Sequence, residues 1–145
     1  MKMYPALTLI ACGAVQAVLD TALPLARLWP AWNPFGLVPL LAGFALAAWS
    51  AYTFHMHQTT VHPFKPASAL VTTGPFAFSR NPIYLGMSLV LLGFAIALGT
   101  LSPFVMVPVF MILLTRTIIS GEERMLTETF GAEYDMWRGK VRRWF

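Results

Sequence analysis

Two polar segments of this 145-residue chain hold the residue types that could do chemistry. The first segment covers residues 70–86. It contains two turn signals, Gly74-Pro75 and Asn81-Pro82, since the residue before a proline is biased toward extended backbone. Pro82 predicts a helix start, because the N–H that proline lacks has no partner in the first helical turn. The free amides of such a turn suit a ligand carboxylate or phosphate.

Three aromatic side chains of this segment could also contribute to binding. Phe76, Phe78 and Tyr84 offer flat apolar faces on which an adenine ring could stack. The same residues suit an aromatic belt at a membrane interface, next to the start of a helix. The residue types alone leave both interpretations open.

The second segment begins with Glu122-Glu123, directly after an apolar run. Two adjacent carboxylates repel each other, so a nearby cation is expected to stabilise their charged forms. Arg80, Arg124, or the ammonium or sulfonium group of a ligand could supply that charge. The alternative is that water at a membrane interface solvates both acids.

The histidines and the cysteine do not indicate a metal site. His55, His57 and His62 could supply at most two ligands on one face, with no carboxylate close by, so no metal is expected. Cys12 is the single cysteine, which excludes an intramolecular disulfide and a thiolate cluster.

The composition places the chain in a membrane. It is 57% apolar and 11% charged, whereas soluble domains carry roughly a quarter charged residues. A chain this short cannot bury so much apolar surface away from water, so membrane lipids are its expected surroundings. The net charge of +4 is not arranged as a basic stripe with interleaved aromatics, and nucleic-acid binding is therefore not expected.

We therefore expect a single all-α domain, residues 1–145, with about four transmembrane helices. Two long stretches lack formal charge, and the second, between Arg80 and Arg116, has room for a tightly connected pair of spans. The predicted helices cover residues 4–28, 36–54, 83–98 and 104–119, with turn residues between them. In the tail, apolar residues at helical spacing predict an amphipathic cytoplasmic helix that either continues the fourth span or folds onto the membrane surface: Met125, Leu126, Thr129 and Phe130.

The cations predict the orientation of this multi-pass protein. With both termini cytoplasmic, as in a bacterial inner membrane, only Arg27 faces outward and Arg116 lies near the inner end of the fourth span. The remaining cations then all face inward: Lys2, Lys65, Arg80, Arg124, Arg138, Lys140, Arg142 and Arg143. A cleavable signal peptide over residues 1–26 is disfavoured, because Asp20 interrupts the apolar run and no small-residue cleavage site follows.

Gln16 and Asp20 lie within the first predicted span. They are four residues apart and therefore share one face of the helix. Polar groups at such a depth usually face the interior of a helix bundle. A hydrogen bond between helices is favoured over a contact with substrate.

Taken together, the two polar segments resemble the isoprenylcysteine carboxyl methyltransferase and phospholipid N-methyltransferase superfamily. The resemblance extends over about residues 60–145, which would form the cofactor-binding part. It rests on the order and spacing of several short motifs: Leu70-Val71, Gly74-Pro75-Phe76, Arg80-Asn81-Pro82, Tyr84, Gly86, Glu122-Glu123, Phe130-Gly131 and Tyr134.

The resemblance implies methyl transfer from S-adenosylmethionine, with the cofactor enclosed by cytoplasmic loops and helix ends. In that reading Phe76 packs on the cofactor, Asn81 and Tyr84 line it, and Glu122 holds its amino group. The other residues implied at the cofactor are Ser68, Ala69, Leu70, Val71, Gly74, Arg80 and Pro82. No G-x-G-x-x-G motif follows a predicted strand, so a Rossmann-type cofactor site is not indicated.

The sequence departs from the carboxyl methyltransferases of eukaryotes at three positions. Asn81 replaces a histidine, Phe76 replaces a tyrosine, and Ile118 replaces an arginine that is thought to face the substrate carboxylate. Arg116 and Glu123 are the candidate catalytic residues, although Arg116 points to a different side of an α-helix from Ile118. The departure at Ile118 makes methylation of a carboxylate doubtful.

The expected substrate is a lipophilic small molecule or lipid that reaches the site from the cytoplasmic leaflet. The rival hypothesis is a non-catalytic membrane subunit or lipid-binding module on the same scaffold. Both depend on one spatial condition. The turn before the third span and the acid pair after the fourth must converge on a common cavity.

Overall fold

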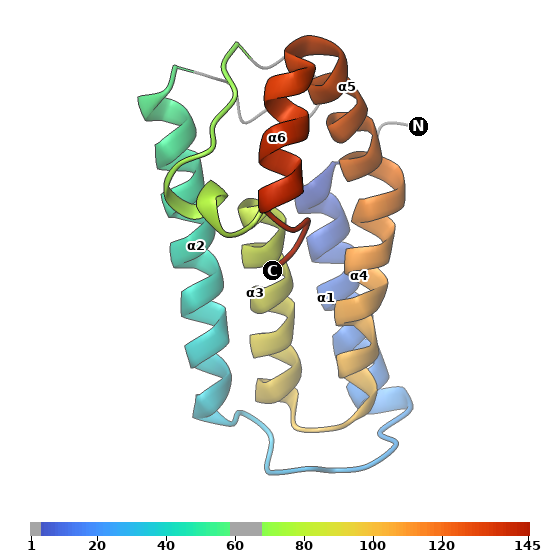
Figure 1. The fold of residues 1–145 in the computed structure, drawn as a ribbon. Coiled ribbons are helices and arrows are strands. Elements are labelled where there is room, and N and C mark those ends of the chain that lie inside the picture. Colours follow the sequence, from blue (N-terminus) through green and yellow to red (C-terminus); the bar gives the residue numbers. More distant parts are fainter. Residues whose placement is uncertain (1–3, 59–67) are drawn as a thin grey trace.

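The computed structural model describes residues 4–58 and 68–145, and within these ranges the regular elements are helices (Figure 1). A single isolated bridge joins Arg27 and Thr100. The main helices are α1 (Pro5–Ala22), α2 (Leu37–Met56), α3 (Pro82–Leu98), α4 (Met106–Leu114), α5 (Ser120–Phe130) and α6 (Ala132–Lys140). Short 3₁₀ turns cover Pro34–Gly36, Gly74–Ala77 and Ser102–Val105, and a π-helical segment covers Thr115–Ile119.

The predicted membrane architecture is confirmed. Three helical stretches are long and apolar enough to cross a membrane, namely Pro5–Ala22, Pro34–Met56 and Ser102–Phe130, and the shorter apolar helix Pro82–Leu98 completes a bundle of four. Successive helices run in opposite directions, so the start of α1, the turn before α3 and helices α5 and α6 share one end (Figure 1). This arrangement brings both polar segments of the sequence to the same end of the bundle.

The first span is shorter than predicted. Residues 4–28 were expected to be helical, but α1 ends at Ala22 and Leu23 has non-helical backbone angles (φ −141°, ψ 61°). Pro24 accounts for this, because proline disfavours the helical conformation of the residue before it. The chain then crosses the far end of the bundle, where the Leu28 N–H donates to the Gly99 carbonyl at 2.8 Å.

The fourth span is a long rod of 29 residues, Ser102–Phe130, that includes α4, the π-helical segment and α5. Within it, the Ser120 hydroxyl donates to the Thr115 carbonyl at 2.6 Å. A spanning helix needs about 20 residues, so the rod is long enough to extend past the hydrocarbon core. At Gly131 the backbone takes φ +50°, which suits glycine, and the chain reverses into α6. The tail therefore continues the span through α5 and then folds back.

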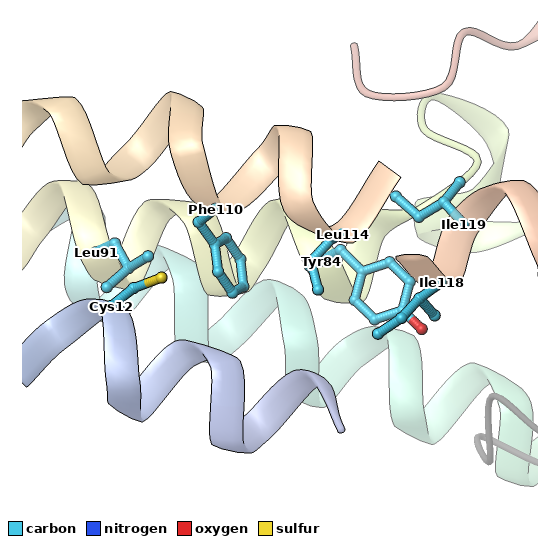
Figure 2. Close-up of a cluster of buried hydrophobic side chains, with 7 residues drawn as sticks. All are labelled: Cys12, Tyr84, Leu91, Phe110, Leu114, Ile118 and Ile119. Carbon is cyan, nitrogen blue, oxygen red and sulfur yellow. The ribbon is translucent and has the colours of Figure 1, made fainter. Parts of the chain in front are cut away.

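The interior of the bundle contains a cluster of buried apolar side chains (Figure 2). Phe110, Leu114 and Ile119 are fully buried in this cluster. Gln16 is also fully buried, and its Nε2 donates to the carbonyls of Leu91 (3.0 Å) and Pro103 (3.1 Å). Asp20 accepts a 2.6 Å hydrogen bond from the Thr100 hydroxyl. The expectation that Gln16 and Asp20 make hydrogen bonds within the bundle is thus confirmed.

Helices α2 and α3 approach each other so closely that only glycine fits at the contact. A Cβ placed on Gly86 would lie 2.6 Å from the Gly43 carbonyl oxygen and 3.1 Å from the Ala47 nitrogen. Two turns along the same pair, a Cβ on Gly93 would lie 2.5 Å from the Gly36 carbonyl oxygen. Small residues let helix backbones pack closely in membranes, where hydrophobic burial does not drive helix association. This seam fixes α3, and with it the turn that precedes α3.

We expect Gly86→Ala to lower the stability of the protein by about 1–3 kcal/mol, because the added methyl group meets backbone atoms that cannot move aside. Gly139→Ala in α6 is the matched control, since nothing lies within 4 Å of its Cβ position and alanine favours helix. Thermal unfolding midpoints in detergent measure the difference. A Gly86→Ala midpoint equal to that of the control would contradict the close packing of α2 and α3.

Candidate functional site

A cavity of about 270 Å³ lies at the end of the bundle where the two polar segments meet. Its polar lining comes from the turn before α3, from α3 itself, from the acid pair of α5 and from α6: Arg80, Asn81, Tyr84, Glu122, Glu123, Tyr134 and Trp137. Its apolar lining includes Phe54, Ala69, Leu70, Val71, Phe76, Ile83, Met87, Met125 and Leu126. The spatial condition stated from the sequence is therefore met.

The local sequence explains how the turn before α3 reaches the cavity. Gly74 has φ +60°, a conformation that glycine adopts without strain, and Pro75 follows it into the 3₁₀ turn. This turn buries Phe76, which is 4% exposed and contacts Phe54 with ring centroids 4.6 Å apart. Asn81 is non-helical before Pro82, as expected for a residue that precedes proline.

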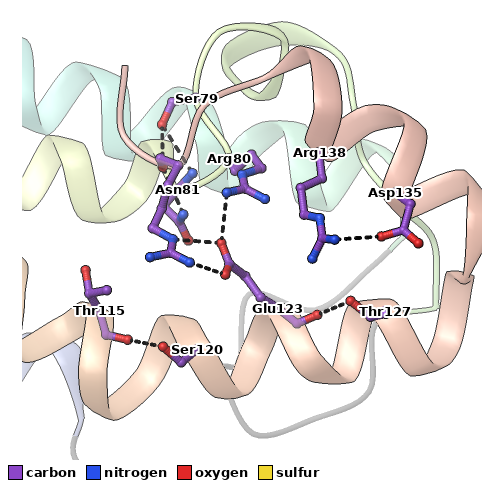
Figure 3. Close-up of polar contacts among 10 residues, drawn as sticks. Ser79, Arg80, Asn81, Thr115, Ser120, Glu123, Thr127, Asp135 and Arg138 are labelled. Carbon is purple, nitrogen blue, oxygen red and sulfur yellow. Dashed lines mark hydrogen bonds and ion pairs between the residues drawn. The ribbon is translucent and has the colours of Figure 1, made fainter.

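The two adjacent glutamates have different partners. The Tyr84 hydroxyl donates to Glu122 Oε1 at 2.8 Å, and no ion pair joins Glu122 to a cation within residues 4–58 and 68–145. Glu123 instead pairs with Arg80 at 3.2 Å, as Figure 3 shows, and with Arg143 at 2.6 Å. Arg80 was one of the cations predicted to compensate the acid pair. Arg124, the other, is exposed and makes no ion pair in the described part of the chain.

Arg80 has hydrogen-bonding capacity to spare. Its side chain is 11% exposed and lines the cavity, and its Nη2 contacts Glu123. Its Nε and Nη1 are buried and have no hydrogen-bond partner among the residues that the structure describes. Buried polar atoms are nearly always paired, so these two N–H groups are suited to an acceptor that enters the cavity.

Helix α6 forms one side of the cavity. Tyr134 is 1% exposed, and the Trp137 indole donates to the Phe76 carbonyl at 3.3 Å, which joins α6 to the turn before α3. Burial raises the pKa of Tyr134, and the charge of Glu123 adds to the shift. The hydrogen bonds from Arg143 to Glu123 raise the pKa of that guanidinium above its usual value. Both groups thus keep their protons at neutral pH.

Sequence reasoning did not assign Arg143 as a partner of Glu123, and it did not assign nine residues to the cavity lining: Pro5, Ala6, Phe54, Ile83, Met87, Met125, Leu126, Trp137 and Tyr134, of which only Tyr134 had been noted as part of a motif. Phe54 and the N-terminal residues Pro5 and Ala6 lie outside the stretch 60–145, so the cavity also takes lining from α1 and α2. For α6 a signal existed, since Tyr134 and Trp137 stand three apart on one helix face. Nothing in the local sequence indicated Arg143.

Three predicted site residues do not line the cavity. Ser68 donates to the Gln58 carbonyl at 3.1 Å, and Gly74 faces Thr53, whose hydroxyl would lie 3.3 Å from a Cβ there. Arg116 is exposed on the π-helical segment, whereas Ile118 is buried in the core cluster. The remaining predicted positions all line it: Ala69, Leu70, Val71, Phe76, Arg80, Asn81, Pro82, Tyr84, Glu122 and Glu123.

The histidines show no shared ligand arrangement. His57 Nδ1 lies 2.9 Å from the Thr53 carbonyl, and no group of three or more His, Cys, Asp or Glu side chains gathers within the described ranges. His62 lies outside those ranges, as do Lys2 and Lys65, on which the predicted orientation partly rests.

Substitutions of the two glutamates are expected to change the stability of the protein by different amounts. Glu123→Gln removes the charge that compensates buried Arg80, and we expect a loss of about 1.5–3 kcal/mol. Glu122→Gln keeps a hydrogen-bond acceptor for Tyr84 and leaves no cation without its partner. The stability of this variant should therefore stay within about 1 kcal/mol of wild type. Thermal unfolding in detergent compares them, and equal losses for both variants would contradict the pairing described above.

Comparison with known proteins agrees with this geometry. The profile of the phospholipid methyltransferase family matches residues 32–133, a stretch that includes the turn before α3 and the acid pair. An uncharacterized protein of Haemophilus influenzae is 36% identical over 62 residues, which cover 43% of this chain and 98% of that protein. No solved structure matches the chain. The resemblance inferred from the short motifs is confirmed: this chain is an integral membrane protein that belongs to the phospholipid methyltransferase family.

Proposed function

We propose that this protein is an S-adenosylmethionine-dependent methyltransferase that acts on a lipophilic, membrane-borne substrate at the cytoplasmic leaflet. The observation that carries the proposal is the cavity itself, which combines the family's motif residues with an apolar wall. Tyr84 and Glu122 meet there at 2.8 Å although they come from different helices.

The residues present fit the cofactor. Glu122 has no cationic partner among the described residues, so its carboxylate is suited to the amino group of the cofactor, with Tyr84 fixing its orientation. The unpartnered N–H groups of Arg80 are suited to an anionic group, and Phe76 offers a flat face for the adenine. Ala69, Leu70 and Val71 supply the backbone beside these side chains.

The cofactor supplies a methyl group that is already activated on a sulfonium. The protein therefore needs chiefly to hold the acceptor close and aligned, which can account for a large part of a rate enhancement. The apolar wall keeps water away from the acceptor: Ile83, Met87, Met125 and Leu126. A general base is needed only for an acceptor that arrives protonated.

The lining also favours a lipophilic acceptor. Pro5 and Ala6 at the start of α1 lie on the same cavity as Ile83 and Met87 of α3, so its wall includes the ends of membrane-spanning helices. A hydrocarbon chain in the bilayer could reach the cavity between such helices without crossing water. Ile118 is buried in the core rather than on the cavity, so no cation at that position is available for an acceptor carboxylate.

The cytoplasmic assignment rests on the distribution of charge. Arg27 lies in the connection at the far end of the bundle, and the cations of the described C-terminal part lie at the cavity end. Loops rich in Lys and Arg stay on the cytoplasmic side of a membrane. Both termini and the cavity would then face the cytoplasm.

The proposal predicts that Glu122→Gln weakens S-adenosylmethionine binding about 10- to 100-fold, because a charge-assisted contact is replaced by a neutral one. Glu128→Gln is the matched control, since Glu128 is an exposed carboxylate on the same helix. Isothermal titration calorimetry on the purified proteins measures the S-adenosylmethionine affinity of both variants.

A second measurement separates the enzyme from a non-catalytic subunit or lipid-binding module on the same scaffold. Purified protein is incubated with methyl-labelled S-adenosylmethionine and a membrane lipid extract, and the labelled product is identified. A labelled lipid that disappears with Glu122→Gln supports the enzyme. Absence of cofactor binding by the folded wild type would count against it.

A further inference from the structure

Helix α6 forms one side of the cavity, against which its Tyr134 is buried. Its first residue follows Gly131, whose positive φ turns the chain back from α5. Between its ends, Tyr134 and Trp137 line the cavity, and one hydrogen bond ties Trp137 to the Phe76 carbonyl. The position of α6 therefore also depends on the contacts at its C-terminal end.

The far end of α6 is held by the C-terminal strap, which we define as residues 141–145. The Arg80 N–H donates to the Arg142 carbonyl at 3.0 Å, and Asn81 Nδ2 donates to the Arg143 carbonyl at 2.9 Å. Val141 is buried, and Trp144 packs against the core cluster. The strap therefore lies along the turn before α3, from which Arg80 and Asn81 reach the cavity.

Glu123 adds an ionic contact to these bonds. Arg143 Nε donates to Glu123 Oε1 at 2.9 Å, and its Nη2 donates to Oε2 at 2.6 Å. The guanidinium and the carboxylate therefore form a bidentate pair. Oε1 also contacts Arg80 Nη2 at 3.2 Å. A single carboxylate thus joins α5, the turn before α3 and the strap. Paired contacts of this kind fix geometry as well as adding energy.

We propose that Glu123 and Arg143 are positioning residues that latch α6 in place as a wall of the cavity. They do so through the ion pair between them and through the contact of Glu123 with Arg80. The adjacent acids then have separate tasks, since Glu122 faces the ligand and Glu123 holds the wall. That the latch affects cofactor binding rests on the proposed function. That Glu123 and Arg143 hold α6 in place does not depend on that function.

The latch is tested first without any ligand, by hydrogen exchange of the purified protein in detergent. We expect Arg143→Ala to speed exchange of the Arg80 amide and of the α6 amides about tenfold or more, because the strap loses its ionic contact. Arg143→Lys, which keeps the charge but not the paired geometry, should fall between Arg143→Ala and wild type. Arg124→Ala is the matched control, since Arg124 is exposed and adjoins Glu123 in sequence. The amides of the Arg124→Ala variant should exchange at the wild-type rates.

The second measurement is the dissociation rate of S-adenosylmethionine from the same variants. Faster dissociation from Arg143→Ala, about tenfold, with partial recovery in Arg143→Lys, supports the positioning role. Faster exchange with unchanged dissociation would show that the latch does not serve the cavity and would overturn that role. Unchanged exchange in Arg143→Ala would overturn the latch. If wild type binds no cofactor, the proposed function fails, and the exchange data still decide whether the latch exists.

Discussion

The ion pairs of Glu123, at the end of an apolar bundle, bring distant parts of the chain together. Glu123 lies between two guanidinium groups that come from residues 80 and 143. Removing a charge from water is costly unless it is paired and hydrogen-bonded. The position of Glu123 on α5 therefore fixes where the turn before α3 and the strap can lie. The cavity beside them depends on that arrangement.

The rest of the bundle serves to hold this end in place. The glycine seam sets α3 against α2, and the buried amide of Gln16 ties α1 to the carbonyls of residues 91 and 103. The Gln16 Nε2 group is satisfied by these two carbonyls, and a polar group without a partner is costly in lipid. The acid pair, Arg80 and Arg143 gather at the end where the cavity lies.

Much of this organisation could be predicted from the sequence. Composition and the charge-free stretches indicated a four-helix membrane protein, and prolines marked the start of α3 closely, at Pro82 against a predicted residue 83. The family resemblance carried by the short motifs implied ten of the nineteen residues that line the cavity. Arg80 was among the predicted partners of the acid pair for a simple electrostatic reason, and the structure brings them together.

Other features depended on tertiary structure. The end of α1 at Ala22 follows from Pro24, a signal that an apolar run obscured. Arg143 pairs with Glu123 only because Gly131 reverses the chain and α6 carries it back, and no local pattern encodes such a distance. The π-helical segment also could not be foreseen, because it alters hydrogen bonding without altering the apolar pattern.

The π-helical segment sets the direction in which the two acids of α5 point. One residue added to or lost from an α-helix rotates everything beyond it by about 100°. The π-helical turn holds about one residue more than an α-helical turn, so if residues 115–119 wound as ordinary α-helix at the same chain length, Glu122 and Glu123 would turn away from Tyr84 and from the two arginines. The placement of the two acids thus depends on the backbone of residues 115–119 as well as on the residue types at positions 122 and 123.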